Sequence, residues 1–463
     1  MIEAPKASQP LNPNSASLFD PQRRGLSIGL ILVITMIAFE ALGIATVAPA
    51  ISESLNGLQY YGLMFSAFLI AELFGASLAG DQADRFGLSY PISVGMIVFA
   101  VGLLISGFAP TMLIMVLGRI AQGFGSGLLV TSNYVCVSLG YSGPLRSKML
   151  ALMSSAWVTP AFVGPLLASF ITEHGSWRII FLGLVPLCAL AAYLILRPVR
   201  HFKAQDSGKK VSALPALRLS LGASLLLISF NSQHWLLILA TALSGFWLLL
   251  WAVKDFMPPG VLWAKRGIAA LIASRGLFSS SFIAAEAFLS LFISKLLGYT
   301  SFVTAMFIAI GALTWTLGSF LQSRLDSRDG GKHRHHRVII GTAIMLISLS
   351  LLPLKVIFTD LSNIVIFAAW MLAGLGIGLA HASSSVITLD HAKKGEEGKM
   401  SAALQLADLL IASIATGIGG MFIALADRGL ISFHQGLLAA FGFCLLIILL
   451  GFISALRVGD LNH

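Results

Sequence analysis

The sequence predicts an all-α membrane protein that crosses the bilayer many times. Hydrophobic residues make up 57% of the 463 residues and charged residues only 11%, and the mean hydropathy is +0.88. A soluble domain could not keep so much apolar surface out of water. The apolar residues also gather in runs of about 20 residues, the length that a helix needs to cross a bilayer. Because a chain in lipid must satisfy its own backbone hydrogen bonds, we interpret these runs as helices.

Fourteen apolar runs follow one another along the chain. They span about 26–50, 60–80, 91–109, 111–135, 148–172, 177–197, 213–230, 235–253, 268–294, 299–319, 338–358, 362–388, 400–426 and 433–456. The seventh run contains Pro215 and Arg218, so a re-entrant hairpin is the alternative to a full crossing there. In a full crossing, Arg218 would extend to the membrane surface.

The runs divide the chain into five parts. We predict a cytoplasmic tail at 1–25, a six-helix bundle at 26–198 and a linker with two extra transmembrane helices at 199–266. A second six-helix bundle follows at 267–456, and a cytoplasmic tail at 457–463 ends the chain.

The distribution of positive charge predicts the orientation. With the N-terminus placed in the cytoplasm, about 25 of the 30 Lys and Arg residues fall on the cytoplasmic side. Cytoplasmic loops of membrane proteins are enriched in these residues. We therefore expect both termini in the cytoplasm and the protein in the plasma membrane. The same distribution accounts for the net charge of +10 without a nucleic-acid partner.

Neither the cysteines nor the histidines predict a bound metal. Cys136, Cys188 and Cys444 are scattered among apolar runs, with neither disulfide nor metal spacing. The run His333-Arg334-His335-His336-Arg337 could bind a metal by composition. We expect a solvated basic loop there instead.

A short charged segment separates the second and third runs. It reads Gly80-Asp81-Gln82-Ala83-Asp84-Arg85-Phe86-Gly87. Its glycines allow sharp bends, so we predict a tight turn at the membrane surface. Asp84 and Arg85 could pair with helix ends or with charges on a neighbouring helix. The alternative is a turn that is merely solvated.

The chain also contains an internal repeat. Gly123-Phe124-Gly125-Ser126-Gly127-Leu128 is echoed 251 residues later by Gly374-Leu375-Gly376-Ile377-Gly378-Leu379. Glu40-Ala41 is echoed 246 residues later by Glu286-Ala287. The repeat predicts two halves of similar build.

The charged segment resembles the loop between the second and third helices of the major facilitator superfamily, Gly-x-Leu-Ala-Asp-Arg-x-Gly followed by a basic pair. The matching positions are Gly80, Ala83, Asp84, Arg85 and Gly87. Gln82 replaces the leucine, and Leu88-Ser89 replaces the basic pair. The resemblance implies a conformational latch at the cytoplasmic end. It also implies two six-helix bundles, here with two inserted helices as in the fourteen-helix drug:proton antiporter branch.

A second resemblance lies in the fourth run. Gly118-Arg119-Ile120-Ala121-Gln122-Gly123-Phe124-Gly125 is similar to the family's Arg-x-x-Gln-Gly-x-Gly motif. A guanidinium in lipid needs a carboxylate or water. The resemblance implies that Arg119 couples transport to protons, by stabilising the charged form of a carboxylate until substrate or conformation changes the pairing. The alternative is a structural ion pair.

Two glutamates at matching places in the repeat are the main candidates for proton binding. Glu40 lies near the middle of the first run, and Glu286 is its counterpart in the second half. A carboxyl in a dry pocket can bind a proton near neutral pH. Repeat symmetry would direct both towards one central cavity. Either could carry the proton, and one could bind a cationic substrate.

Three further polar residues lie within apolar runs. They are Glu72 in the second run, His381 in the twelfth and Asp408 in the thirteenth. Glu72 and Asp408 are candidates for proton coupling or substrate binding, or they support the interface between the halves. For His381 we favour a packed position near a helix end.

The fifth run carries a third resemblance. Pro160-Ala161-Phe162-Val163-Gly164-Pro165 is similar to the antiporter motif, in which Gly-Pro follows a glycine and three further residues. Gly164 and Pro165 match, and Pro160 replaces the first glycine. Pro165 removes a helix hydrogen bond and the small residues allow close helix approach, which suits a bending or sealing helix. In the family this motif marks exporters.

The sequence therefore predicts a proton-coupled antiporter that exports lipophilic or amphipathic compounds, cations among them, and not an enzyme. We expect it to work as a monomer in the lipid bilayer, with the proton gradient in place of a cofactor. Within transport, the alternative is an exporter of a lipid or cell-envelope metabolite. Outside transport, the alternative is a membrane sensor or scaffold that keeps the fold.

Overall fold

The computed structural model describes residues 17–21, 23–141, 143–200, 202, 214–231, 235–392 and 397–459. All regular secondary structure in these residues is helical. Most of both predicted tails and of the basic stretch after 200 lie outside the described residues.

The first half of the chain forms seven α-helices that make six crossings. They are α1 (Arg24–Ser54), α2 (Tyr61–Phe86), α3 (Ser89–Gly107), α4 (Met112–Gly140), α5 (Gly143–Ser155), α6 (Val158–His174) and α7 (Arg178–Val199). Helices α5 and α6 together make the fifth crossing.

Two inserted helices and a second set of six follow. They are α8 (Leu214–Asn231), α9 (Trp235–Phe256), α10 (Ile268–Leu291), α11 (Ser301–Asp329), α12 (Arg334–Ile357), α13 (Asn363–Asp390), α14 (Glu397–Asp427) and α15 (Phe433–Ala455). A π-helical turn, Phe292–Leu296, extends α10.

Thirteen of the described crossings are long and apolar enough to span a membrane, which makes this a multi-pass membrane protein. The described apolar part of α8, Leu217–Leu226, is shorter. Nevertheless α8 is one continuous helix of 18 residues, or about 27 Å at 1.5 Å per residue. This continuity favours a full crossing over a re-entrant hairpin.

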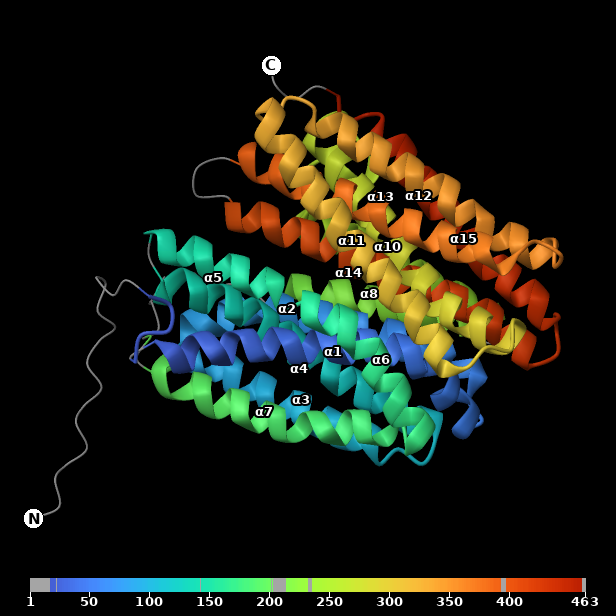
Figure 1. The fold of residues 1–463 in the computed structure, drawn as a ribbon, viewed down its shortest axis with the longest axis horizontal. Helices are drawn as coiled ribbons and strands as arrows, with labels where there is room; N and C mark the ends of the chain where they lie inside the picture. Colours follow the sequence, from blue (N-terminus) through green and yellow to red (C-terminus); the bar gives the residue numbers. More distant parts are fainter. Residues whose placement is uncertain are drawn as a thin grey trace, which may run out of the picture.

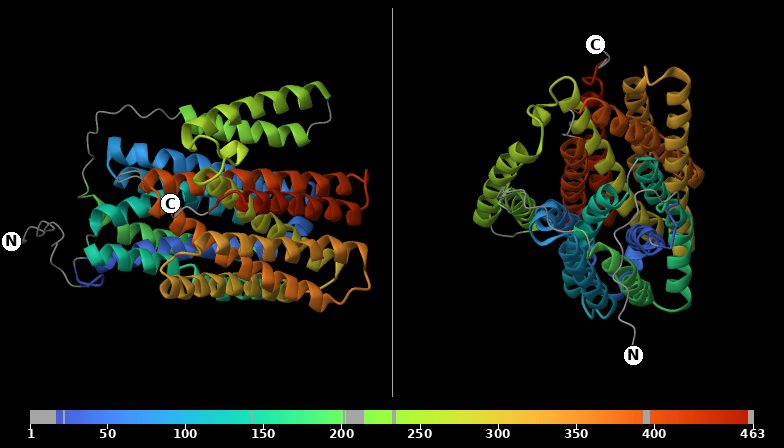
Figure 2. Two further views of the ribbon diagram at one scale, coloured as in Figure 1. Left: turned by 90° about the horizontal axis from the view of Figure 1, so that it is seen from above. Right: turned by 90° about the vertical axis from the view of Figure 1, so that its left-hand side faces the viewer.

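The two halves lie side by side as two helical bundles (Figure 1). We call the end of the assembly where α1 begins and α15 ends the terminal end, and the other the far end. The inserted pair lies at the side of both bundles (Figure 2). Leu219 and Ala223 of α8 pack in one apolar cluster with Leu73 of α2 and Ala407 of α14, so the pair contacts both halves.

The repeated glycines pack helices in the same way in both halves. A methyl group at Gly123 or Gly127 would overlap the backbone of α2, and one at Gly125 would overlap α3. In the second half, Gly374 and Gly378 face α11 in the same manner, and Gly376 faces α12. Small residues let membrane helices approach closely, so the repeat is a packing device.

The charged segment 80–87 is not the turn that the sequence predicts. Helix α2 continues through Gly80 to Phe86, and only Gly87, with a φ of 82°, leaves the helix. Asp81 and Arg85 form an ion pair of 2.9 Å one helical turn apart, which supports the helix. Glycine suits the positive φ of the residue that ends the helix.

The predicted basic loop at His333–Arg337 also differs in the structure, because α12 begins at Arg334. Arg334 donates to both carboxylate oxygens of Asp326 at the end of α11, with distances of 2.8 and 2.9 Å. Arg337 pairs with Asp326 and Asp329. These pairs hold the segment as a helix start.

The break in the fifth crossing lies beside Pro160, while α6 continues through Pro165. Proline has no N–H for the carbonyl four residues earlier, which is that of Ala156. The hydroxyl of Thr35 on α1 donates to this carbonyl over 3.5 Å. Farther along α6, Gly164 lies against Phe39 and Ala168 against Gly43 of α1.

We predict that Gly62→Ala destabilises the protein. Gly62 of α2 packs against Gly420 of α14, where an added methyl would overlap the Gly420 Cα and the Thr416 carbonyl. Overpacking costs about 1–3 kcal/mol, against a gain of about 1 kcal/mol in helix propensity. The melting temperature of the purified protein should fall. The matched control is Gly442→Ala in α15, which has open space and should leave the melting temperature unchanged or raise it. Equal effects of both variants would contradict the prediction.

Candidate functional site

The first buried charge cluster joins α1, α2 and α4. Arg119 of α4 is 3% exposed and forms an ion pair with Glu40 of α1, which is fully buried. The guanidinium also donates to Gln122 Oε1 at 2.6 Å and to the Met64 carbonyl at 3.3 Å. It lies 4.1 Å from the ring centroid of Phe68. The cluster neutralises a charge that lipid alone could not hold.

The pairing of Glu40 leaves one carboxylate oxygen over. Glu40 Oε2 is buried without a hydrogen-bond partner in the described part of the chain. Gln122 extends the network by donating to Ser106 of α3 at 3.2 Å. Arg119 thus holds one carboxylate oxygen of Glu40 and leaves the other without a partner. In this geometry the carboxyl can take up a proton when the Glu40–Arg119 ion pair separates.

Glu72 lies on α2 and belongs to a smaller contact. Ser126 of α4 donates a hydrogen bond to Glu72 Oε1 at 3.0 Å. The side chain thus joins α2 to α4 within the first half, where the glycines of α4 bring the two helices together.

A second buried charge cluster lies in the other half. Arg275 of α10 donates through Nε to both oxygens of Asp408 on α14, at 3.2 and 3.0 Å. Its Nη1 donates to the hydroxyls of Ser384 and Ser385 on α13, at 3.1 and 2.8 Å. His381 Nε2 lies 3.9 Å from Asp408 Oδ2. Asp408 and His381 thus meet at one site, and Asp408 is paired within its own half.

Arg275 is the member of this cluster that the sequence analysis missed. It lies two turns into α10. In the count of Lys and Arg residues it therefore falls among the charges near the cytoplasmic ends of helices. The signal was available, since Arg275 is an arginine inside a long apolar run. Such a residue calls for a carboxylate partner, and Asp408 was the acid inside another run.

Glu286, the repeat counterpart of Glu40, has no such pairing. Its side chain forms neither a hydrogen bond nor an ion pair with any described residue, and it is partly exposed. The next residue, Ala287, accepts a hydrogen bond from the Tyr61 hydroxyl of α2 at 2.7 Å. Glu286 therefore lies beside a contact between the halves, with a carboxyl available for a proton or a cation.

Further polar contacts join the halves near the far end. Lys295 Nζ lies 2.7 Å from Glu53 Oε2. The backbone N–H of Phe302 donates to Glu173 Oε1 at 2.9 Å. Together with Tyr61 and the Gly62–Gly420 contact, they hold the halves together at this end.

Of the remaining predicted site residues, those of the segment 80–87 lie away from both clusters, whereas those of the antiporter motif lie beside the first. Asp84 and Arg85 are exposed near the end of α2, at the terminal end of the assembly. Pro160, Gly164 and Pro165 are on α6, which packs on α1 near Glu40. In the described residues no group of three or more His, Cys, Asp or Glu side chains could hold a metal ion.

We predict that Arg275 and Asp408 are energetically coupled. Arg275→Met leaves a buried carboxylate alone, which costs about 3–5 kcal/mol, whereas replacing both charges by apolar groups is often neutral. The melting temperature should therefore fall in Arg275→Met and recover in Arg275→Met/Asp408→Leu. If the double variant is less stable than either single variant, the two side chains do not act as a pair.

Comparisons with known proteins agree with this architecture. The family model of the Major Facilitator Superfamily matches residues 27–416. The multidrug efflux pump SdrM of Staphylococcus aureus (strain N315) is 25% identical over 413 residues, covering 86% of this chain and 89% of that protein. A probable multidrug-efflux transporter of Mycobacterium tuberculosis is 26% identical over 439 residues, with 90% and 91% covered.

Solved structures share the fold at low sequence identity. A POT family transporter in complex with 5-aminolevulinic acid is similar with a TM-score of 0.70 and 15% identity, over 98% of this chain and 99% of that one. The D-xylose-proton symporter is similar with a TM-score of 0.68 and 15% identity, over 94% and 97%.

Proposed function

This chain belongs to the major facilitator superfamily, and we propose that it is a proton-coupled antiporter that exports lipophilic or amphipathic compounds by alternating access. Relatives that span most of its length are multidrug efflux pumps, which supports small-molecule export. The family also makes it a transporter and not an enzyme.

The observation that carries the coupling is the contrast between the two repeated glutamates. Glu40 is held by Arg119, whereas Glu286 has no partner among the described side chains. A carboxylate can bind a proton or a cation but not both at once. Mutually exclusive binding at one acid is the simplest physical basis for exchange. The substrate accompanies one conformational change and the proton accompanies the reverse change, and each can bind only after the other has left.

The cycle follows from this competition. The substrate binds from the cytoplasm while Glu286 is charged, and it leaves after the halves open outwards. A proton from outside then neutralises Glu286 or Glu40, which weakens the hold on a cationic substrate and favours the return. Protonation of Glu40 would also free Arg119, so that the first half changes its own packing.

The orientation that we propose follows from the bias of Lys and Arg. It puts both termini in the cytoplasm. We also propose that the protein works as a monomer in the plasma membrane. The terminal end then faces the cytoplasm. The far end, where Tyr61, Lys295 and Glu173 join the halves, then faces outside, so these contacts between the halves lie on the outer side.

We predict that a proton gradient drives transport and that the glutamates couple it. In proteoliposomes with an acidic interior, wild type should accumulate ethidium against its own gradient. Glu40→Gln and Glu286→Gln should lose this uphill accumulation, because a glutamine cannot exchange a proton. Glu40→Gln should keep downhill exchange, whereas Glu286→Gln should also bind ethidium more weakly, because it lacks the charge that holds a cation. The exposed Asp427→Asn is the matched control and should behave as wild type.

Three outcomes count against the proposal. Full proton-driven accumulation in both glutamine variants would remove the coupling role of these acids. Failure of any gradient to move ethidium or a panel of other amphipathic solutes in wild type would favour the sensor or scaffold. Movement of lipid-like solutes alone would favour the exporter of a cell-envelope metabolite.

We predict that Tyr61→Phe opens the far end more often. The change removes only the hydroxyl that binds the Ala287 carbonyl, a bond worth about 0.5–1.5 kcal/mol. An Ile283→Cys reporter, at a half-buried position of α10 three residues before Glu286, should then react about two- to tenfold faster with an impermeant maleimide added outside. Tyr60→Phe, at a neighbouring tyrosine, is the control. No change in rate, or slower labelling, would contradict the prediction.

A further inference from the structure

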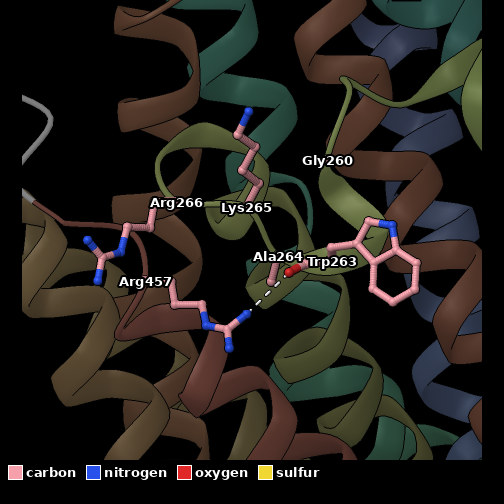
Figure 3. A pocket seen from close by; sticks show the side chains of 6 residues that line it. All are labelled: Gly260, Trp263, Ala264, Lys265, Arg266 and Arg457. Carbon is pink, nitrogen blue, oxygen red and sulfur yellow. Dashed lines mark hydrogen bonds between the residues drawn. The ribbon is translucent and has the colours of Figure 1, made fainter.

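The segment between α9 and α10 forms a basic pocket at the terminal end. The pocket has a volume of about 460 Å³. It is lined by Gly260, Trp263, Ala264, Lys265, Arg266 and Arg457 (Figure 3). None of these residues belongs to the charge clusters inside the membrane, so the transport cycle leaves the pocket unexplained.

The backbone of this segment is held in a defined shape. Gly260 and Ala264 have φ values of 92° and 44°, and the Lys265 N–H donates to the Gly260 carbonyl at 3.0 Å. A left-handed alanine is strained and persists only where its surroundings hold it. The Gly267 N–H donates to the Arg457 carbonyl at 3.2 Å, which ties the segment to the end of α15.

Three cationic side chains line the pocket and extend from it in different directions (Figure 3), and no described carboxylate neutralises them. Lys265, Arg266 and Arg457 are exposed and form no ion pair with the described residues. Arg457 Nη1 donates to the Trp263 carbonyl at 3.2 Å, as the dashed line in Figure 3 shows. This bond fixes the guanidinium and leaves its other N–H groups for an anion.

The position of the pocket distinguishes a lipid from a soluble anion. It lies between the end of α9 and the start of α10, where membrane helices meet the headgroup layer. Trp263 is 81% exposed and Leu262 is 50% exposed beside the cations. An exposed tryptophan next to basic residues at helix ends is typical of the membrane interface. Basic pockets at this level suit phospholipid headgroups.

We propose that this pocket binds the phosphate of an anionic phospholipid headgroup. Arg457, which is held against the Trp263 carbonyl, contacts the phosphate, and Lys265 and Arg266 add to the positive potential around it. Trp263 and Leu262 lie against the glycerol and upper acyl chain of the same lipid. Bound there, the lipid contacts the inserted pair through its link and the second half through Arg457. The inference is independent of the substrate and of proton coupling.

The test measures quenching of Trp263 in nanodiscs. Phosphatidylglycerol or phosphatidylcholine, brominated near the glycerol, is titrated into unlabelled phosphatidylcholine, and the Trp263→Phe signal is subtracted. Phosphatidylglycerol should reach half-maximal quenching at a mole fraction at least threefold lower than phosphatidylcholine. The Lys265→Gln/Arg266→Gln/Arg457→Gln variant should lose this preference. Arg266→Gln alone should reduce it, in case the triple variant folds poorly.

The matched control is Arg197→Gln/Arg200→Gln/Arg324→Gln, which removes the same charge from the terminal end outside the pocket and should keep the preference. Equal quenching by both lipids would overturn the proposal, as would equal loss in the control variant. Inorganic phosphate at millimolar concentration should not abolish the preference. If it does, the pocket is a site for a soluble anion.

Discussion

An ionised side chain inside a bilayer must meet an opposite charge or water, and this constraint organises both halves of the protein. Arg119 and Arg275 are each enclosed by helices and each bound to a carboxylate, Glu40 and Asp408. Around each pair, hydrogen bonds to side chains and carbonyls use further guanidinium N–H groups. The helices that supply these groups are thereby fixed relative to one another.

The two pairs are not related by the repeat. Arg119 is on the fourth helix of its half and Arg275 is on the first, so the halves share packing but not charge placement. The glycines do follow the repeat, since they serve the close approach of the second, third and fourth helices in each half. Packing can stay symmetrical while one half keeps its glutamate paired and the other leaves Glu286 open.

Pairing within each half has a consequence for motion. Because Arg119 and Arg275 each pair with a carboxylate of the same half, neither ion pair must break when the halves move against each other. The polar far-end contacts between the halves are of a weaker kind, and they include one hydroxyl, one partly exposed ion pair and one backbone N–H. Such contacts can be exchanged for contacts with water. The arrangement therefore suits alternating access.

The sequence by itself determined the number and order of the apolar helices, the duplication and which acids lie within those helices, because hydropathy and the cost of burying charge are local properties of a run. It could not show that segment 80–86 is helical, since a charged, glycine-bounded segment fits a turn or a helix end, and the Asp81–Arg85 pair decides. Nor could it show that Arg275 binds Asp408 while Glu286 stays unpaired. Partner choice among buried charges depends on which helices become neighbours, and only the packed bundle decides that.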